Sequence, residues 1–138
     1  MRKAVVGVVS GLAAWIAMVA VAGLILRSSW PAYASVADAM TFTLPMMLAR
    51  LTIGALATLV AGWVTTAISP QSMLARLMPG LLLLIAFIPQ HITLWNMFPI
   101  WYHLTFLLSL VPLTYLGGIL ITGRRGHALP AGNLSRER

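Results

Sequence analysis

The chain has no cysteine and only two acidic residues, Asp38 and Glu137, among its 138 residues. Without cysteine there can be no disulfide, thiolate metal site, iron–sulfur cluster or cysteine nucleophile. The two carboxylates lie far apart in the chain, so paired-carboxylate acid–base chemistry has no basis. No catalytic Ser/His/Asp spacing, glycine-rich phosphate loop or metalloprotease signature is present either. We therefore expect a protein that is not an enzyme and that holds no cofactor or metal.

Charge is scarce as well. Charged residues make up 8% of the chain and hydrophobic residues 60%. A soluble domain carries roughly 25% charged residues, and small domains bury the smallest fraction of their surface. Lipid is therefore the expected solvent. The formal net charge of +7 lies mostly at the chain ends and in one loop. In a membrane protein such charge signals topology, so we expect the lipid bilayer as partner and no nucleic acid.

Four apolar runs are long enough to cross a bilayer, which takes about 20 residues in a helix. They cover residues 4–26, 44–68, 77–94 and 100–122, and the third has Pro79 near its start, where a first helical turn tolerates proline. Open strands would leave backbone groups unpaired in lipid, so all four are expected to be helices. The sequence predicts an all-α membrane protein, an up-down bundle of four transmembrane helices over residues 1–123, with a basic cytoplasmic tail over 124–138. The "AYAS" at 32–35 resembles a signal-peptide cleavage site, but the preceding run is longer than a signal h-region, so we expect the first helix to stay uncleaved.

The distribution of basic residues predicts the orientation. If the N-terminus lies inside, the outer side carries only Arg27, whereas the inner side carries Arg2, Lys3, Arg76, Arg124, Arg125, Arg136 and Arg138. Cytoplasmic loops are enriched in Lys and Arg, so both termini are expected in the cytoplasm. Aromatic residues are expected to form an outer interfacial belt that includes Trp30, Tyr33, Trp95, Trp101 and Tyr102.

Small residues recur every four positions along three of the helices. The second run has Gly54, Thr58, Gly62 and Thr66 in line with Arg50; the first has Gly7 and Gly11; the fourth has Thr114, Gly118 and Thr122. Residues four apart share one helical face. Small residues let membrane helices approach closely, and threonine hydroxyls can bond across the contact. We therefore expect these faces to pack against other helices.

Arg50 lies inside an apolar run, and an arginine in the bilayer core costs at least about 2.5–3.5 kcal/mol on insertion scales. Two interpretations remain open. Arg50 can snorkel outward, since it lies six residues, or roughly 9 Å, below Leu44. Alternatively it has a buried partner. Asp38 can reach it only if Pro45 breaks the helix and segment 31–43 folds back over the bundle. Otherwise a lipid phosphate, a ligand or another subunit supplies the counter-charge.

Polar residues gather around the last hairpin. Gln90 and His91 lie near the end of the third run, and Tyr102 and His103 lie near the start of the fourth. A short hairpin places the two histidines at similar depth, and with Arg50 and Asp38 they are expected to line one outward-facing pocket. The histidines either bond water and headgroups at the interface or form part of a redox or quinone pocket. Two histidines are too few for an all-protein zinc site. Asp38 can equally be an interfacial loop residue.

The segments "AGWVTTAIS" and "MPGLLLLIAFIPQHITLWNMFPIWYHLTFLLSLVPLTYLGGIL" resemble a loose group of small bacterial four-helix membrane proteins. The shared features are a small-residue turn in helix two, an outer hairpin rich in proline and aromatics, and a fourth helix ending in Leu-Gly-Gly. The resemblance implies the architecture and a multi-pass protein of the bacterial inner membrane. It assigns no catalytic residue. Small multidrug transporters have the same size, but their membrane-embedded glutamate in helix one is missing here.

Three functions remain open from the sequence. The first is a non-enzymatic accessory or assembly subunit that binds lipid or another membrane protein near Arg50. The second is a small transporter or channel subunit that acts as a homo-oligomer, with Arg50 as an anion contact. The third is a redox or quinone-binding subunit that uses His91 and His103.

Overall fold

The structure is a computed structural model that describes residues 2–70 and 72–126. In that part of the chain the regular structure is entirely helical. Five helices follow one another: α1 (Arg2–Ser29), α2 (Pro31–Ala37), α3 (Leu44–Ile68), α4 (Met73–Thr93) and α5 (Ile100–Gly126). Among them α1, α3, α4 and α5 are long and apolar enough to cross a membrane. The prediction of an all-helical protein with four candidate spans is confirmed. The tail expected over 124–138 lies, from residue 127 on, outside the described residues.

Local sequence explains where the helices begin. Pro31 is the first residue of α2 and Pro45 the second residue of α3, positions where a missing N–H costs nothing. Pro45 thus starts α3 and does not break it. The Ser72 side chain accepts a hydrogen bond from the Ala75 amide at 3.1 Å, and this cap begins α4 at Met73. Helix α4 therefore begins four residues before the span expected over 77–94, and Pro79 lies inside the helix instead of in its first turn.

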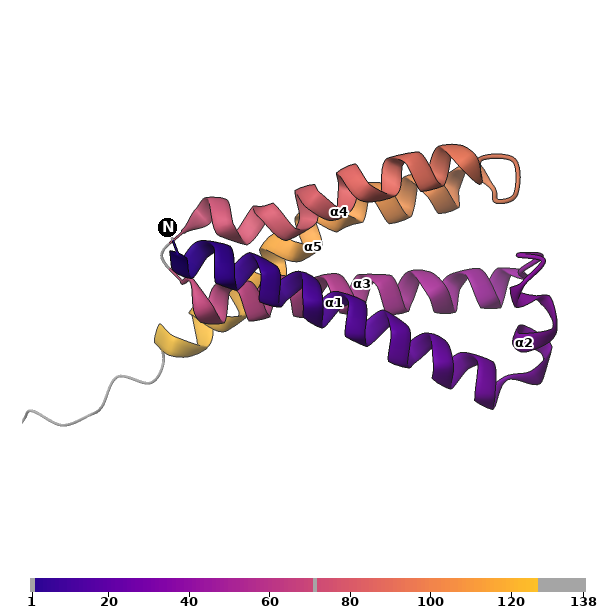
Figure 1. Cartoon of the computed structure of the whole chain (residues 1–138), viewed down its shortest axis with the longest axis horizontal. Coiled ribbons are helices and arrows are strands. Elements are labelled where there is room, and N and C mark those ends of the chain that lie inside the picture. The colour runs from indigo at the N-terminus through magenta and orange to yellow at the C-terminus, as the bar shows by residue number, and fades with distance from the viewer. Residues whose placement is uncertain (1, 71, 127–138) are drawn as a thin grey trace, which may run out of the picture.

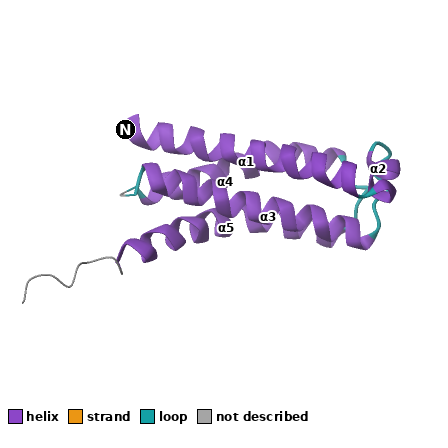
Figure 2. Cartoon of the chain, turned by 90° about the horizontal axis from the view of Figure 1, so that it is seen from below, coloured by secondary structure: helices purple, strands orange, loops and turns teal. Residues whose placement is uncertain are grey.

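Glycines allow the helices to touch backbone to backbone. Gly11 of α1 lies on the Ala61 carbonyl of α3, and a Cβ on Gly62 of α3 would overlap the Thr114 carbonyl of α5. Gly80 of α4 likewise lies against the Leu110 carbonyl and the Thr114 side chain of α5. The order of these contacts makes α1 antiparallel to α3 and α4 antiparallel to α5, with α3 and α5 parallel (Figures 1 and 2).

The two helix pairs, α1 with α3 and α4 with α5, lie close together at the end that holds the N-terminus and diverge toward the end that holds α2 (Figure 1). The glycine contacts gather at the close end. Toward the open end large aromatic side chains take their place: Trp15 lies 5.3 Å from Phe87, and Phe87 lies 5.1 Å from Phe106, between ring centroids. Small residues bring the helices together at one end, and aromatic rings hold them apart at the other.

The short helix α2 folds back against the open end. Its Tyr33 and Ala37 form a small buried cluster with Met46 of α3, and Leu26 and Phe42 pack around it. The segment between α1 and α3 is therefore part of the bundle rather than a free loop, and it carries Tyr33 to the position described next.

Candidate functional site: a polar cavity in the open half of the bundle

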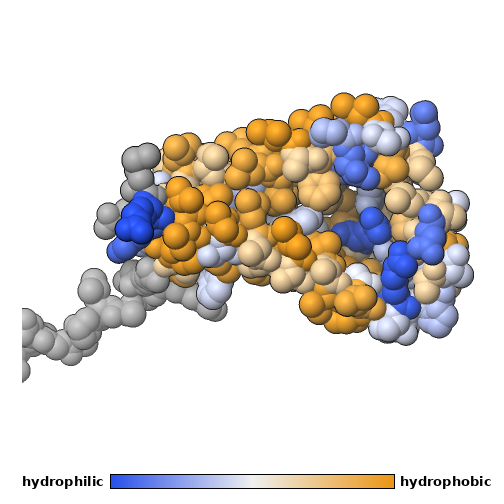
Figure 3. All heavy atoms as spheres, in the orientation of Figure 1, coloured by the Kyte–Doolittle hydropathy of each residue, from blue (hydrophilic) through white to orange (hydrophobic). Residues whose placement is uncertain are grey.

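A cavity of about 290 Å³ lies between α1, α3, α4 and α5, with α2 beside it. Aromatic side chains form much of its wall, from Trp15, Phe87, Phe98 and Phe106. Figure 3 shows a hollow in the apolar side of the molecule, between the α1–α3 pair and the α4–α5 pair, with hydrophilic residues at it. The cavity thus combines a largely apolar wall with a few polar groups, as small-molecule sites do.

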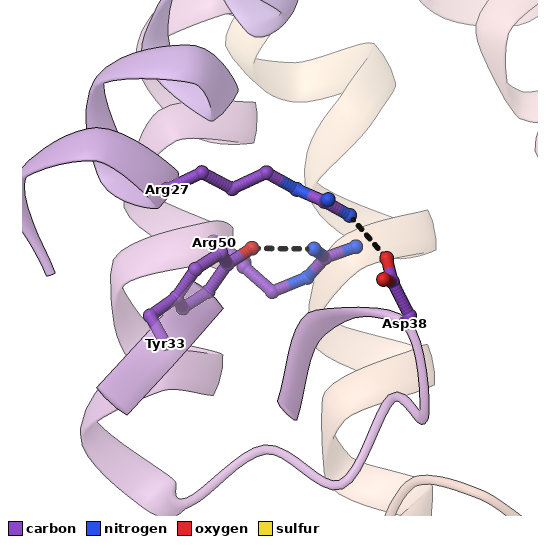
Figure 4. A network of polar contacts seen from close by, with 4 residues as sticks. All are labelled: Arg27, Tyr33, Asp38 and Arg50. Carbon is purple, nitrogen blue, oxygen red and sulfur yellow. Dashed lines mark hydrogen bonds and ion pairs between the residues drawn. The ribbon is translucent and has the colours of Figure 1, made fainter. Parts of the chain in front are cut away.

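Arg50, in the second turn of α3, supplies the cationic group of the cavity. Its Nη1 donates a hydrogen bond to the Tyr33 hydroxyl at 2.8 Å (Figure 4). Its Nε donates a longer one to the Tyr102 hydroxyl at 3.4 Å. Its guanidinium carbon also lies 4.7 Å from the centroid of the Phe42 ring, a cation–π distance. These partners come from α2, α5 and the segment before α3, so the arginine ties three elements together.

None of these Arg50 partners is charged. Asp38 is the one carboxylate among the described residues, and it pairs with Arg27 at 3.0 Å (Figure 4). The side chains of Arg27 and Asp38 are 52% and 89% exposed, so this pair lies at the surface. The possibility that Asp38 folds back onto Arg50 is therefore not realised. Segment 31–43 does fold back, but the packing of α2 turns Tyr33 inward and leaves Asp38 outside.

The two histidines of the last hairpin lie against each other. The Nδ1 atoms of His91, on α4, and His103, on α5, are 2.7 Å apart. At this distance one Nδ1 carries the proton and the other accepts it, so the two rings share one proton. His103 is fully buried and stacks on Trp95, with ring centroids 4.9 Å apart. Its Nε2 is buried and has no partner among the described residues.

Tyr102 connects the two polar groups. Its hydroxyl accepts from Arg50, and its ring lies 6.4 Å from that of His91, between centroids. Five of the expected site residues therefore line one cavity: Arg50, Gln90, His91, Tyr102 and His103. Asp38 is not among them. No group of three or more potential metal-ligating side chains occurs in the part of the chain that the structure describes.

The expected packing residues lie at helix contacts. Gly7 and Gly11 of α1 face Thr65 of α3, whose hydroxyl donates to the Gly7 carbonyl at 3.1 Å. The contacts of the others are as follows: Gly54 faces Phe106, Thr58 accepts from the Trp15 indole at 3.1 Å, Gly62 faces Thr114, and Gly118 faces Thr66 and Arg76. These faces of small residues therefore pack against other helices of the same chain.

Sequence reasoning missed several residues that matter here. Tyr33 was expected only in an interfacial belt, Phe42 was not expected beside Arg50, and Trp15 and Phe106 were not expected in the cavity wall. No periodic pattern relates them, since they come from four different elements. The one available signal was the proline at 31, which favours a short helix after Trp30 and so predicts a structured connection.

Comparisons with known proteins found no matching family model, no matching curated protein and no matching solved structure.

Proposed function

We propose that this protein is a non-enzymatic, multi-pass protein of a bacterial inner membrane that binds a lipid-soluble ligand in the cavity at Arg50, and that it serves as an accessory subunit of a membrane system. The observation that carries the proposal is that, among the described residues, Arg50 pairs only with neutral groups, Tyr33, Tyr102 and the Phe42 ring, at the wall of an apolar cavity. A guanidinium has five N–H donors, and two are used here, so three remain for a ligand.

The Arg50 side chain stays exposed beside buried Tyr33 and Tyr102. A cation without a counter-charge in the apolar part of a bilayer is costly, which favours a ligand with an anionic or strongly accepting oxygen. The aromatic wall suits an apolar body, and the hollow on the side of the bundle suits entry from the bilayer (Figure 3). The small-residue faces are already occupied within the chain, which supports the Arg50 cavity, and not a helix face, as the functional surface.

The orientation belongs to the proposal. We place both termini, in an up-down bundle, on the cytoplasmic side. Arg2, Lys3 and Arg76 lie near helix ends at the close end of the bundle, whereas the described part of the open end has Arg27 at a helix end and Arg50 in the second turn of α3. The cavity then faces the outer leaflet.

Purification of the protein in lipid nanodiscs, followed by extraction and mass spectrometry of bound small molecules, tests the proposal. Wild-type protein is expected to carry an amphiphile with an oxygen-bearing head, and Arg50→Gln to lose it. Arg27→Gln, which removes an exposed arginine, is the matched control and is expected to keep it. Arg50→Lys is expected to retain less ligand than wild type, because one ammonium cannot reproduce the planar fork that spans Tyr33 and Tyr102. Identical extracts from the wild-type and Arg50→Gln proteins would overturn the proposal.

A further inference from the structure

The cavity has a second polar group that a ligand with a single head does not use. His91 and His103 line the cavity together with Arg50, and Tyr102 stands between the histidines and the arginine. A fatty acid or phospholipid head needs only the guanidinium. A ligand with an oxygen at each end of a short rigid body would engage both groups.

The histidine pair can act either as donor or as acceptor. The Nδ1 atoms of His91 and His103 bond each other at 2.7 Å, so each ring keeps one further polar atom, Nε2. When the shared proton is on His103, a neutral His91 carries its own proton on Nε2 and donates. When the shared proton is on His91, the second proton of the pair lies on His103 Nε2, so the Nε2 of His91 is bare and accepts. His103 is fully buried, whereas His91 keeps 8% of its surface exposed, so His91 is the ring that a ligand can reach.

The aromatic wall of the cavity that both polar groups line suits a flat ring. The rings of Phe87 and Phe106 meet edge to face at 5.1 Å, and Trp15 lies 5.3 Å from Phe87, between centroids. Aromatic faces favour stacking or edge contacts with another ring over contact with a flexible acyl chain.

We propose that the ligand is a lipid-soluble quinone or its quinol, with one ring oxygen at Arg50 and the opposite oxygen at His91. A quinone oxygen accepts a hydrogen bond and a quinol oxygen also donates one, and the histidine pair matches both by the position of its shared proton. His103 positions His91 and sets its tautomer. The apolar tail leaves through the hollow on the side of the bundle (Figure 3). This inference rests on the proposed function, since it names the class of ligand that the Arg50 cavity takes.

Titration of the protein in phosphatidylcholine nanodiscs tests it with three probes: a decyl benzoquinone, a decyl-substituted ring without oxygens, and decanoate. The wild-type protein is expected to bind the quinone at least tenfold more tightly than the oxygen-free ring, because each hydrogen bond is worth about 1 kcal/mol and more when the donor is charged. Arg50→Gln is expected to lower the affinity for both the quinone and decanoate. His91→Phe keeps an aromatic ring. It is expected to lower the affinity for the quinone about fivefold to tenfold and to leave the affinity for decanoate within about twofold of wild type, since only the quinone uses the second polar group.

His91→Gln restores an amide donor and acceptor and guards against a folding defect in His91→Phe; it is expected to retain quinone binding better than His91→Phe. Asp38→Asn, which changes an exposed carboxyl outside the cavity, is the control and is expected to bind as wild type. Arg50-dependent decanoate binding without quinone binding would overturn the quinone assignment and leave the proposed function standing. Equal quinone affinity in wild type, His91→Phe and His91→Gln would also overturn it. Binding of neither probe would overturn both.

Discussion

Arg50 and Tyr33, seventeen residues apart, are joined by a hydrogen bond of 2.8 Å from the guanidinium Nη1 to the phenol oxygen. Tyr33 is 3% exposed, so its hydroxyl meets the guanidinium inside the fold, while the rest of the Arg50 side chain stays exposed. Arg50 does extend toward the open end of the bundle, as a snorkelling side chain would. It ends on the inner side of α2, where Tyr33 and Phe42 surround it, and this makes it a wall of the cavity.

Tyr33→Phe tests the contribution of this contact to stability. The substitution keeps the ring within the cluster of α2 and removes only the acceptor of Arg50 Nη1. We expect a loss of about 1–2 kcal/mol, because hydrogen bonds to charged groups exceed those between neutral groups. Thermal unfolding in detergent, followed by circular dichroism, measures it. Tyr115→Phe, on α5 and outside the cavity lining, is the matched control and should melt as wild type. Equal melting of the two variants would show that the bond stabilises nothing.

Gly62→Ala tests the close approach of α3 and α5. A Cβ at this position would overlap the backbone carbonyl of Thr114, which cannot turn away as a side chain can. We expect a destabilisation of about 1–3 kcal/mol or more, as for overpacked cores. The control is Gly23→Ala on α1, where an added Cβ meets nothing within 4 Å. That change should be neutral or stabilise the helix by up to about 1 kcal/mol, since alanine is the better helix former. A tolerant Gly62 would contradict the packing described for α3 and α5.

A double-mutant cycle on Trp15 and Thr58 measures the hydrogen bond that links α1 to α3. The indole Nε1 donates to the Thr58 hydroxyl at 3.1 Å, and that hydroxyl donates to the Gly54 carbonyl at 2.7 Å. Trp15→Phe, Thr58→Val and the double variant should show a coupling free energy of about 0.5–1.5 kcal/mol, in the range for hydrogen bonds between membrane helices. Unfolding in mixed micelles supplies the values. Additive single effects would mean that the two side chains only pack together.

The absence of native cysteine makes the orientation directly testable. Asn96→Cys lies between α4 and α5 at the open end, and Met73→Cys lies at the start of α4 at the close end. Both native residues are exposed. In intact cells a membrane-impermeant maleimide should label the cysteine at 96 and not the one at 73, and permeabilisation should make both reactive. The reverse pattern would place the cavity on the cytoplasmic side.

Several features of the fold follow from local sequence. Four apolar runs with little charge predict four helices, because only helices satisfy every backbone group in lipid within one segment. The start of α4 was predicted less well, since the Ser72 cap extends the helix beyond the apolar run. Gly80 and Gly117 were also not predicted as packing residues. Each lies against the α5 or α3 backbone, but neither belongs to a long repeat of small residues.

The candidate site was only partly predictable. Gln90, His91, Tyr102 and His103 flank one short hairpin, so their proximity follows from chain connectivity. The direct contact between His91 and His103 depends on the rotation of α4 against α5, which the close approach of Gly80 to Leu110 sets. Residue spacing alone does not specify that rotation.

The sequence by itself determined the solvent of this protein, the helical form of its spans and the small-residue faces through which they can meet, because these depend on composition and on a period of four residues. The tertiary structure alone decided the partner of Arg50. Burial of Tyr33, Ala37 and Met46 holds α2 against α3. That packing directs the phenol of Tyr33 to the guanidinium and leaves Asp38 at the surface with Arg27. Such a choice between two nearby side chains comes from contacts between elements distant in sequence.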